Sequence, residues 1–387
     1  MLRASEKPMS DTPSFTIGIE EEYLLVDAVT RDLDADPSAG FVAECHAEGG
    51  GQIGHEFLRS QIEVGTRACR TVGEAVDDLR RLRRTVAEVA ARHGLAPVAA
   101  SSHPFARVLR QKRTDKDRYV ALAEEMQAAA RRMLICGMHV HVGIDDNEAR
   151  IDLMNQLSYF LPHLLALSSS SPFWEGELTG LKSFRLTVLN ALPRSGLPDR
   201  YASWSEYQRH IDTLIRTGLI QDTSKIWWDI RPSWRYPTLE TRIMDCCTSI
   251  EDSACLAALV QSLLRCLWRL RRRNQQWRHY AGLLINENRW RAARYGVDEG
   301  LLDLGRGELL PFAILLEELI ELVREDAAAL GCLAEVEHAR VVLARGTSAN
   351  RQVAVYEAAL AAGASEQEAL VAVVDWLVGE TVRGLQA

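Results

Sequence analysis

The chain has 387 residues, of which 47% are hydrophobic and 25% charged, a composition that argues against a disordered protein. Its 45 basic and 53 acidic residues leave a net charge of −8, which disfavours a nucleic-acid-coating protein and attraction to an anionic membrane. The N-terminal sequence lacks the apolar core of a secretory signal, and the longest uncharged stretch, residues 153–174, is too polar for a membrane span. Eight cysteines without a CxxC pair indicate reduced thiols, so we expect a soluble cytoplasmic protein.

The first half of the chain predicts both strands and helices, preceded by a flexible arm over residues 1–14. A helix is expected over residues 71–93, because Thr71 and Glu74 match a capping box and Gly94 is a helix stop signal. Apolar spacing predicts the remaining elements of this half. They are strands over 15–26, 53–65, 95–100 and 135–144, and helices over 115–133 and 146–167.

The second half begins with residues 168–201, which are polar and rich in glycine and proline. Three strands are expected here, over 184–190, 225–230 and 239–245. Strands scattered between helices without a regular βαβ rhythm favour an α+β fold with an antiparallel sheet. We expect a single catalytic domain over residues 15–387, whose last third, about 251–387, is helical.

The strand predicted at residues 15–26 carries three consecutive glutamates. Glu20 and Glu22 share one face with Gly18, whereas Glu21 falls on the apolar face, where we place it at the edge. Two carboxylates ~6–7 Å apart repel each other by ~2–3 kcal/mol at an effective dielectric of 20. A hard divalent cation such as Mg²⁺ or Mn²⁺ removes this repulsion. An exposed edge strand with solvated glutamates is the alternative.

The strand predicted at residues 135–144 places His139 and His141 on one face, flanked by Gly137 and Gly143. Glycines beside the histidines let a ligand approach the backbone closely. An H-x-H pair also occurs in metal-dependent hydrolases, but those enzymes need an α/β barrel, and its βα rhythm is absent here. A structural pair of histidines on a polar sheet face is the other alternative.

A tryptophan-rich segment precedes the last predicted strand. Arg231 and Arg235 lie in its proline-broken loop, where a guanidinium can stack on an aromatic ring and grip a carboxylate or a phosphate. Glu240 and Arg242 share one face of the following strand. Surface arginines lying over aromatic rings are the alternative. The sequence contains no G-x-S-x-G or Cys–His nucleophile pattern.

Nine segments, in chain order, resemble the carboxylate–amine ligase family, also called glutamate–cysteine ligase type 2. They are G-I-E-E-E-Y-L-L-V-D (18–27), S-Q-I-E-V-G-T (60–66), M-H-V-H-V-G (138–143), S-S-P-F-W (170–174), T-G-L-K-S-F-R (179–185), A-L-P-R-S-G-L-P (191–198), W-W-D-I-R-P-S (227–233), L-E-T-R-I-M-D (239–245) and N-E-N-R-W-R-A-A-R-Y-G (286–296). The resemblance implies a glutamine-synthetase-like catalytic fold, in which a curved antiparallel sheet lines the site and helices pack on one side. It also implies ATP-dependent amide formation through an acyl phosphate.

The resemblance assigns site residues as well. Ligands for Mg²⁺ or Mn²⁺ are implied at Glu20, Glu22, Glu56, Glu63, His139 and Glu240. The catalytic candidates are Arg231 and Arg242, and the candidates for cofactor binding are His141, Arg185, Arg235, Arg289 and Arg294. Which of these arginines contact ATP and which contact the acid substrate stays open. Glu56 and Glu63 have opposite strand parity, so both can line one site only if a bulge or bend separates them.

Glutamate and cysteine are the substrates that the family name implies, with ATP and a divalent cation as cofactors. The sequence shows no recognisable thiol pocket, so the amine acceptor stays open. A guanidino-type phosphotransferase on the same fold, a non-catalytic binding relative and an H-x-H hydrolase are the alternatives; retention of the acidic positions argues against the binding relative. We expect small-molecule substrates and no nucleic-acid or membrane partner, and homo-oligomerisation stays open.

Overall fold

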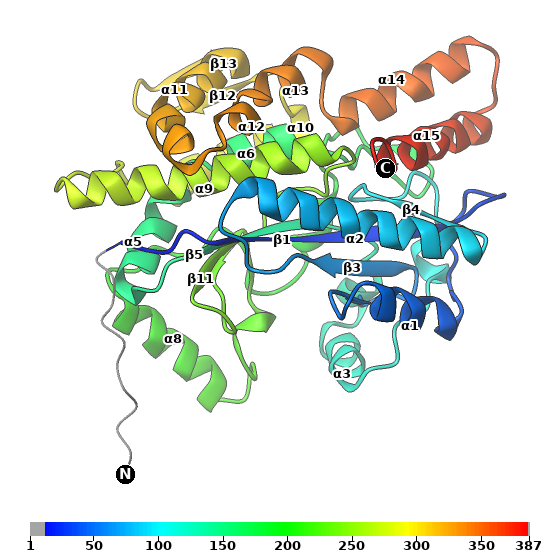
Figure 1. Cartoon of the computed structure of the whole chain (residues 1–387), viewed down its shortest axis with the longest axis horizontal. Helices are drawn as coiled ribbons and strands as arrows, with labels where there is room; N and C mark the ends of the chain where they lie inside the picture. Colours follow the sequence, from blue (N-terminus) through cyan, green and yellow to red (C-terminus); the bar gives the residue numbers. More distant parts are fainter. Residues whose placement is uncertain (1–11, 386–387) are drawn as a thin grey trace.

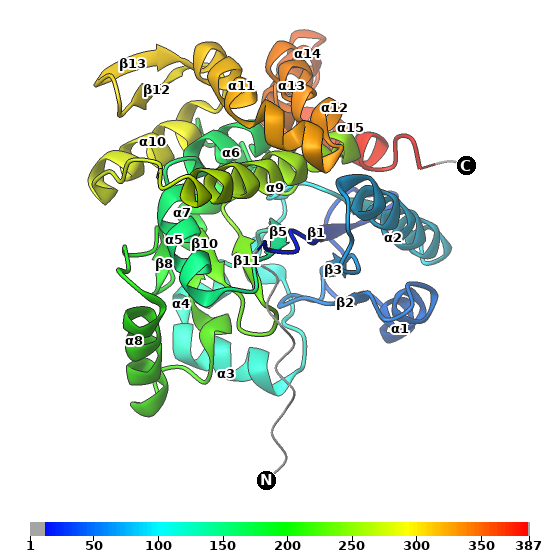
Figure 2. The ribbon, with the colours of Figure 1, turned by 60° about the vertical axis from the view of Figure 1, so that its left-hand side comes forward.

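The computed structural model describes residues 12–385, so residues 1–11 of the predicted arm lie outside the described part. The centre of the molecule is an antiparallel sheet of seven strands (Figure 1, Figure 2). Its strand order is β10-β11-β5-β1-β3-β2, and β4 pairs with the C-terminal end of β1. The bounds are β1 Ile17–Asp27, β2 Ile53–His55, β3 Gln61–Gly65, β4 Leu95–Val98, β5 Met138–Gly143, β10 Ile230–Pro232 and β11 Thr238–Thr241. The predicted α+β class with an antiparallel sheet is confirmed.

Two long helices, α2 (Val72–Arg92) and α9 (Ile250–Arg272), pack against one face of the sheet (Figure 1). Helix α2 begins as predicted, because the Thr71 side chain accepts the backbone N–H of Glu74. Among residues 12–385, α9 alone is long and apolar enough to cross a membrane, but 83% of its apolar window is buried inside the protein. Burial on all sides is what a core helix requires, and this explains its composition.

The last third of the chain stacks on the far side of α9 (Figure 1). Its helices are α10 Gly282–Tyr295, α11 Phe312–Leu330, α12 Leu333–Glu337, α13 Ala339–Arg345, α14 Ser348–Ala361 and α15 Glu366–Thr381. The prediction of a wholly helical segment is wrong at one place, where the hairpin of β12 (Gly300–Asp303) and β13 (Glu308–Pro311) interrupts it. Gly307, at a φ of 73°, closes the turn of this hairpin. Buried apolar side chains from Phe15 to Leu385 form one continuous core.

The remaining segments of the first two thirds of the chain are short. The helices are α1 Ala39–Glu48, α3 Asp117–Met126, α4 Ala128–Arg131, α5 Asn147–Leu157, α6 Leu161–Ser168, α7 Arg185–Leu189 and α8 Trp204–Arg216, with 3-10 turns at Val108–Arg110 and Thr223–Lys225. The short strands are β6 Phe173–Trp174, β7 Glu177–Leu178, β8 Ser195–Gly196 and β9 Trp227–Trp228. Of these segments, α1, α3, α7, the turn at Thr223–Lys225 and β9 contribute residues to the cavities described below.

Three predicted elements are divided in two. The strand expected over 53–65 contains a turn between β2 and β3, and the helix expected over 115–133 breaks at Gln127, which has a φ of 46°. The helix expected over 146–167 breaks after α5, and Pro162 lies in the first turn of α6. Proline favours that position because its missing N–H has no helical partner there.

Three other strand predictions are wrong in part. Residues 185–189 form helix α7, which starts where the N–H groups of Phe184 and Arg185 bond to Ser171. The strand expected over 225–230 is reduced to the two residues of β9 and the first residue of β10. The last strand, expected to reach residue 245, ends at Thr241 because the N–H groups of Arg242 and Ile243 both bond to the carbonyl of Asp229, at 2.7 and 3.1 Å.

Candidate active site

The open face of the sheet gathers the acidic and histidine side chains of four strands. Alternation along β1 buries Ile19 and Tyr23 and leaves Glu20 and Glu22 half-buried on the open face. The register then places Glu22 opposite Glu63 of β3. It also places Glu20 opposite His139 of β5, and His141 of β5 opposite Glu240 of β11. Residues distant in the sequence therefore meet because adjacent strands pair.

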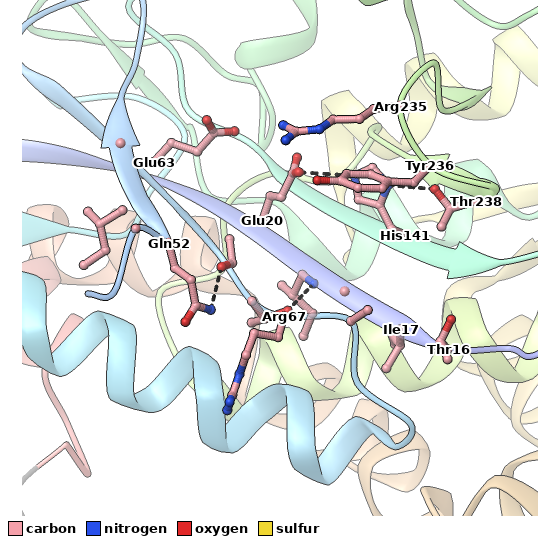
Figure 3. Close-up of a pocket in the computed structure, with 18 of the residues that line it drawn as sticks. Thr16, Ile17, Glu20, Gln52, Glu63, Arg67, His141, Arg235, Tyr236 and Thr238 are labelled. Atoms are coloured by element: carbon pink, nitrogen blue, oxygen red, sulfur yellow. Dashed lines mark hydrogen bonds and ion pairs between the residues drawn. The ribbon is translucent and has the colours of Figure 1, made fainter. Parts of the chain in front are cut away.

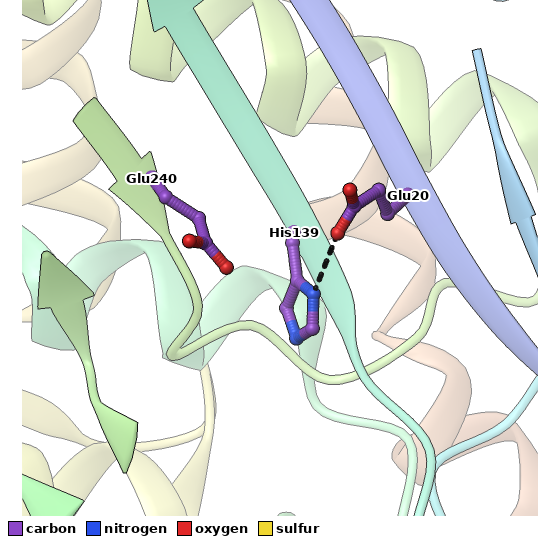
Figure 4. A group of neighbouring side chains, drawn as sticks. All are labelled: Glu20, His139 and Glu240. Atoms are coloured by element: carbon purple, nitrogen blue, oxygen red, sulfur yellow. Dashed lines mark hydrogen bonds and ion pairs between the residues drawn. The ribbon is translucent and has the colours of Figure 1, made fainter. Parts of the chain in front are cut away.

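Glu20, His139 and Glu240 form the first cluster with metal-ligating chemistry, their ligand atoms all lying within 4.8 Å of one another (Figure 4). His139 is buried, and its Nδ1 lies 3.2 Å from Oε2 of Glu20. Burial, reinforced by the charge of Arg242, lowers the pKa of His139 to about 4, so the imidazole is neutral near pH 7. A neutral imidazole keeps the lone pair that a metal ion requires.

Glu22, Glu63 and His139 form a second cluster, again within 4.8 Å, so the two clusters share His139. Burial and the negative charge of Glu56 raise the pKa of Glu22 to about 8. Burial and the charges of Glu56, Glu20 and Glu22 hold the pKa of Glu63 well above its ordinary value. Carboxylates crowded in this way need a cation, and a set of carboxylate oxygens with one imidazole fits Mg²⁺ or Mn²⁺. The residues present therefore fit the predicted metal.

Glu56 reaches the same cavity as Glu63 although the two have opposite parity. It directly follows β2, and the chain turns before β3 begins at Gln61. Thr114 holds the turn: its hydroxyl donates to the Glu56 carbonyl at 2.6 Å and its N–H to the Phe57 carbonyl at 2.9 Å. The predicted bend between the two glutamates is confirmed.

Glu20 and Glu240 stay charged for different reasons. Burial opposes ionisation of Glu20, but its hydrogen bonds with His139 and His141 outweigh that effect and hold its pKa well below the usual range. Burial also opposes ionisation of Glu240, and the adjacent Arg242 and Arg231 hold its pKa far below the usual range. Arg231 grips Glu240 through Nε at 2.9 Å and Nη2 at 3.3 Å, and Arg242 donates to the same carboxylate through Nη1.

The two predicted catalytic arginines differ in what they can still bind. Nη1 of Arg231 donates to the carbonyls of Thr223, Ser224 and Ile226 at 2.9, 3.2 and 2.6 Å, so its guanidinium is occupied by protein acceptors. Arg242 lines the cavity, and within residues 12–385 its guanidinium contacts only the acceptor Glu240 and, at 3.5 Å, His139. Arg242 is therefore available to a ligand, whereas Arg231 positions Glu240.

Arg185 holds the backbone of the segment that directly follows β11. It is buried, and its guanidinium donates to the carbonyls of Arg242 and Ile243 at 3.0 and 3.1 Å. A Cβ on Gly137 would lie 2.5 Å from Nη2 of Arg185, which explains why glycine precedes β5. Sequence reasoning missed Asp245. Its carboxylate accepts hydrogen bonds from the Ser171 and Ser183 hydroxyls and the Ser170 N–H, and so connects the segment after β11 to residues 170–183. These hydrogen bonds measure 2.8, 2.8 and 2.9 Å.

Glu21 is not at the edge of the apolar face, contrary to the prediction. Its carboxylate is fully buried under the sheet, where it pairs with Arg83 of α2 at 2.6 Å and accepts the hydroxyls of Tyr23 and Ser253. A buried charge needs such partners, so this network fixes the face that β1 turns toward the helices. Glu20 and Glu22 are thereby directed to the open face.

Two cavities meet at the acidic clusters. The first, about 970 Å³, extends over the N-terminal half of β1 to α1. The second, about 740 Å³, extends from Glu20 and Glu22 to α3, α7 and β9. Both are lined by Glu20, Glu63, His141, Arg235 and Tyr236, all of which are labelled in Figure 3. His141 lies at this junction, with Nδ1 3.0 Å from Thr238 Oγ1 and Nε2 3.4 Å from Glu20 Oε1.

Two of the predicted binding residues lie elsewhere. Arg289 forms a buried ion pair with Asp229 at 2.6 Å, and Arg294 donates to the carbonyl of Gly180. Neither lines either of the two cavities. Conversely, Arg118 and Trp234 line the second cavity without having been assigned a role from the sequence. Arg118 lies in a helix whose surroundings match none of the nine motifs, so the sequence carried no signal for it.

Known proteins provide a direct comparison. A model for glutamate-cysteine ligase family 2 matches residues 16–374. A Rhodospirillum rubrum protein named "Putative glutamate--cysteine ligase 2" is 59% identical over 379 residues, covering 97% of this chain and 97% of that protein. The chain belongs to glutamate-cysteine ligase family 2. A Paracoccus denitrificans protein with the same name is 54% identical, covering 97% of this chain and 100% of that protein. The family resemblance predicted from the motifs is confirmed.

Solved structures agree with this family at the level of the fold. A Francisella tularensis glutamate–cysteine ligase in complex with AMP matches with a TM-score of 0.67 at 15% identity, covering 98% of this chain and 91% of that chain. A bifunctional glutathione synthetase from Pasteurella multocida matches with a TM-score of 0.65 at 15% identity, covering 95% of this chain and 53% of that chain. The predicted ligase-type fold is confirmed. As a member of this family, the chain is an ATP-dependent ligase.

Proposed function

We propose that the chain joins a carboxylic acid to an amine in an ATP-dependent amide synthesis that passes through an acyl phosphate. The family name implies glutamate as the acid and cysteine as the amine. The observation that carries this proposal is the meeting of two cavities at Glu20, Glu63 and His141. A ligase of this kind must bring a nucleotide and two small molecules to one point, and a junction between two chambers provides that point.

The first cavity suits the nucleotide. Gly65 lies opposite Glu20 and Gly18 precedes it on the same face, so the backbone beside Glu20 is bare and a phosphate chain can approach it closely. Lys116 and Arg235 line the same cavity and, among residues 12–385, form no ion pair within 4.0 Å. Their charges favour a polyphosphate.

The acidic clusters would hold the cation. Glu20, His139 and Glu240 supply one set of ligands, and Glu22, Glu63 and His139 the other. Mg²⁺ or Mn²⁺ bound there supplies charge neutralisation for the phosphate oxygens. The crowding of Glu22, Glu56 and Glu63 supports this assignment, because burial raises the pKa of all three carboxyls despite the nearby positive charge of Arg242.

The chain's own residues then orient the reaction. Arg242 faces the acid and the phosphoryl group and stabilises the negative charge that develops during transfer. Arg231 and Arg185 hold Glu240 and the backbone of Arg242 in place. A carboxylate oxygen of the acid attacks the γ-phosphorus while its bond to the β–γ bridging oxygen breaks and ADP leaves. The amine nitrogen then attacks the acyl carbon, inorganic phosphate leaves with the former carboxylate oxygen, and the nitrogen loses a proton.

The test is ADP release from ATP and glutamate labelled with ¹⁸O in its carboxylates, with and without amine. We expect release that requires both substrates, with ¹⁸O in the released phosphate. A guanidino-type phosphotransferase would release ADP only when a guanidino compound is supplied and would form no amide, and a non-catalytic relative would release none. Amide formation without ¹⁸O in the phosphate would contradict the acyl-phosphate route.

Arg242→Ala provides the matched residue test. Glu240 keeps its bidentate contact with Arg231, so the fold should persist. We expect turnover to fall by ~10²–10³, the range for removing a donor that acts in the transition state, with only a small change in the KM for ATP. Arg340→Ala, which breaks an exposed ion pair with Glu317, is the control and should leave turnover unchanged.

A further inference from the structure

We infer that the nucleobase of the nucleotide lies at the end of the first cavity next to α1, and that His46 selects a purine with an amino group at position 6 over one with an oxygen there. This inference rests on the proposed function, which places the nucleotide in the first cavity. It names the residue that distinguishes ATP from ITP and GTP.

The width of the sheet separates the metal ligands from α1. The proposed function places the phosphates beside Glu20 of β1, which lies opposite Gly65 of β3. The next strand, β2, forms the edge of the sheet, and α1 packs against it. Neighbouring strands lie ~4.8 Å apart, so β2 is ~10 Å from β1. The base of a nucleotide whose phosphates lie at Glu20 therefore reaches the end of the cavity next to α1.

The surface between Glu20 and α1 is bare. Gly54 of β2 lies opposite Glu63, and a Cβ at Gly54 would meet nothing within 4 Å. Gly54 thus continues the uncovered backbone that Gly18 and Gly65 form beside Glu20. A flat ring can approach such a backbone closely. Apolar side chains of α1 and β2 line this end of the cavity, namely Val42, Ala43 and Ile53.

The opposite end of the first cavity is filled by the protein itself. Gly143 of β5 lines this end, but a Cβ there would meet the hydroxyl oxygens of Ser14 and Thr16. A base cannot approach the backbone of Gly143 as it can approach that of Gly54. Tyr236 lies at the junction with the second cavity, where the phosphates and the acid meet. The end next to α1 is therefore the place for the base.

His46, in the last turn of α1, lines this end with one ring nitrogen bonded and the other open. Its Nδ1 lies 2.8 Å from the carbonyl oxygen of Ile53. A carbonyl oxygen can only accept, so Nδ1 carries the proton and Nε2 of the neutral ring is an acceptor. Within residues 12–385, no group forms a hydrogen bond or an ion pair with Nε2.

The glycines at residues 49–51 position this ring and leave Nε2 uncovered. A Cβ on Gly49 would lie 2.5 Å from Cγ1 of Ile53, so the end of α1 is in close contact with β2. Gly51 has a φ of 83°, which favours glycine. A Cβ on Gly51 would lie 3.9 Å from Nε2 of His46, so a longer side chain there would cover this nitrogen.

An acceptor at this place distinguishes purines by their group at position 6. The 6-amino group of adenine donates hydrogen bonds, whereas the 6-oxygen of guanine accepts them. The amino group can therefore donate to Nε2 of His46, whereas an oxygen would face the lone pair of this nitrogen. The geometry of His46 favours ATP for this reason.

The experiment measures the Kd of nucleotides by calorimetry with the full chain and Mg²⁺ at pH 8, without acid or amine, so that no turnover is needed. The nucleotides are ATP, purine riboside triphosphate, which lacks the 6-amino group, and ITP, which has an oxygen in its place. We expect the Kd to rise in this order, by at least ~10-fold from ATP to ITP. ITP loses the hydrogen bond and also brings a second acceptor to Nε2.

Two substitutions test His46 itself. His46→Leu removes the acceptor, so ATP should bind more weakly and the three Kd values should converge. His46→Gln can turn either its oxygen or its NH₂ group toward the base, so it should bind ITP more tightly than the wild type does. His210→Leu is the matched control, because His210 is an exposed histidine on α8 that lines neither cavity. The control should keep the wild-type ratio of the Kd values.

The possible results separate the two proposals. Equal Kd values for ATP and ITP in the wild type, or a preference for ATP that persists in His46→Leu, would overturn the inference and leave the ligase proposal intact. An equal weakening of ATP and ITP in His46→Leu would place His46 beside the ribose or a phosphate and would overturn it as well. A wild-type chain that binds no nucleotide and releases no ADP with any acid and amine would instead refute the proposed function, and the inference with it.

Discussion

Removing the charge of Glu63 should stabilise the metal-free protein while abolishing its response to Mg²⁺. Glu63 faces Glu22 directly across β1 and β3, and no side chain or backbone group in the described part of the chain, residues 12–385, donates a hydrogen bond to its carboxylate. Glu20 is a poorer choice for the same experiment, because its charge is already stabilised by His139 and His141. We therefore choose Glu63→Gln, which retains shape and removes charge.

The expected size follows from the pair with Glu22. Carboxylate oxygens of Glu22 and Glu63 lie within 4.8 Å of each other. Two unit charges at that separation repel by ~3.5 kcal/mol at an effective dielectric of 20. Protonation of one carboxylate also removes the repulsion, but holding a proton at pH 7 on a carboxyl with an ordinary pKa near 4.5 costs about 3 kcal/mol as well. The pKa of Glu22 is raised to about 8, so this carboxyl already carries a proton at pH 7 in most molecules. Relief of a fraction of this cost should raise the melting temperature in EDTA by ~2–5 °C for a chain of this size.

The assay is thermal unfolding in EDTA and in a Mg²⁺ or Mn²⁺ titration. The wild type should gain ~3 kcal/mol at a cation concentration one hundred times its Kd, whereas Glu63→Gln should gain little. The order of the two melting temperatures should therefore reverse between EDTA and saturating cation. Glu177→Gln, an exposed glutamate on β7, is the control and should behave as the wild type. A variant that melts lower in EDTA and keeps the wild-type response to Mg²⁺ would refute the reasoning.

Two further predictions concern a buried histidine and a glycine. Burial lowers the pKa of His163 from 6.5 to about 4. The folded pKa is the lower one, so His163 contributes stability above pH 6.5 that is lost as pH falls toward 4, by up to ~3 kcal/mol. Urea unfolding at pH 7 and pH 4.5 should thus show a smaller loss for His163→Leu than for the wild type, and an equal loss would contradict this assignment. Gly137→Ala should lower ADP release at least ~10-fold, because its Cβ would displace the guanidinium of Arg185, and small displacements at a site have such effects. Gly282→Ala, where a Cβ meets nothing within 4 Å, is its control, and equal activity of the two variants would count against the role of Gly137.

The strand faces of the site were predictable from the sequence alone. A strand alternates with a period of two residues, so Glu20 and Glu22 had to share a face, as did His139 and His141. The opposite parity of Glu56 and Glu63 even required a bend, and the structure has one between β2 and β3. The motifs added the family and the fold, because their order along the chain is specific.

Other features depended on contacts between distant segments. Residues 184–190 have a strand-like pattern, yet Ser171 starts a helical turn there, and Arg242 leaves the strand because its N–H bonds to Asp229. Such bonds join residues far apart in sequence, so local propensity cannot reveal them. The sequences of these two segments therefore could not predict helix α7 or the end of β11 at Thr241.

The roles of the charged residues were divided only by the tertiary structure. Arg231 and Arg242 have similar sequence settings, but the first is occupied by backbone carbonyls and Glu240, whereas the second faces the cavity. Glu21 and Glu22 are neighbours, but one is neutralised by Arg83 under the sheet and the other is crowded by carboxylates above it. The sequence determines which chemical groups a strand presents, because alternation is local. Which groups are paired, buried or left for a ligand is decided by the segments that fold against that strand.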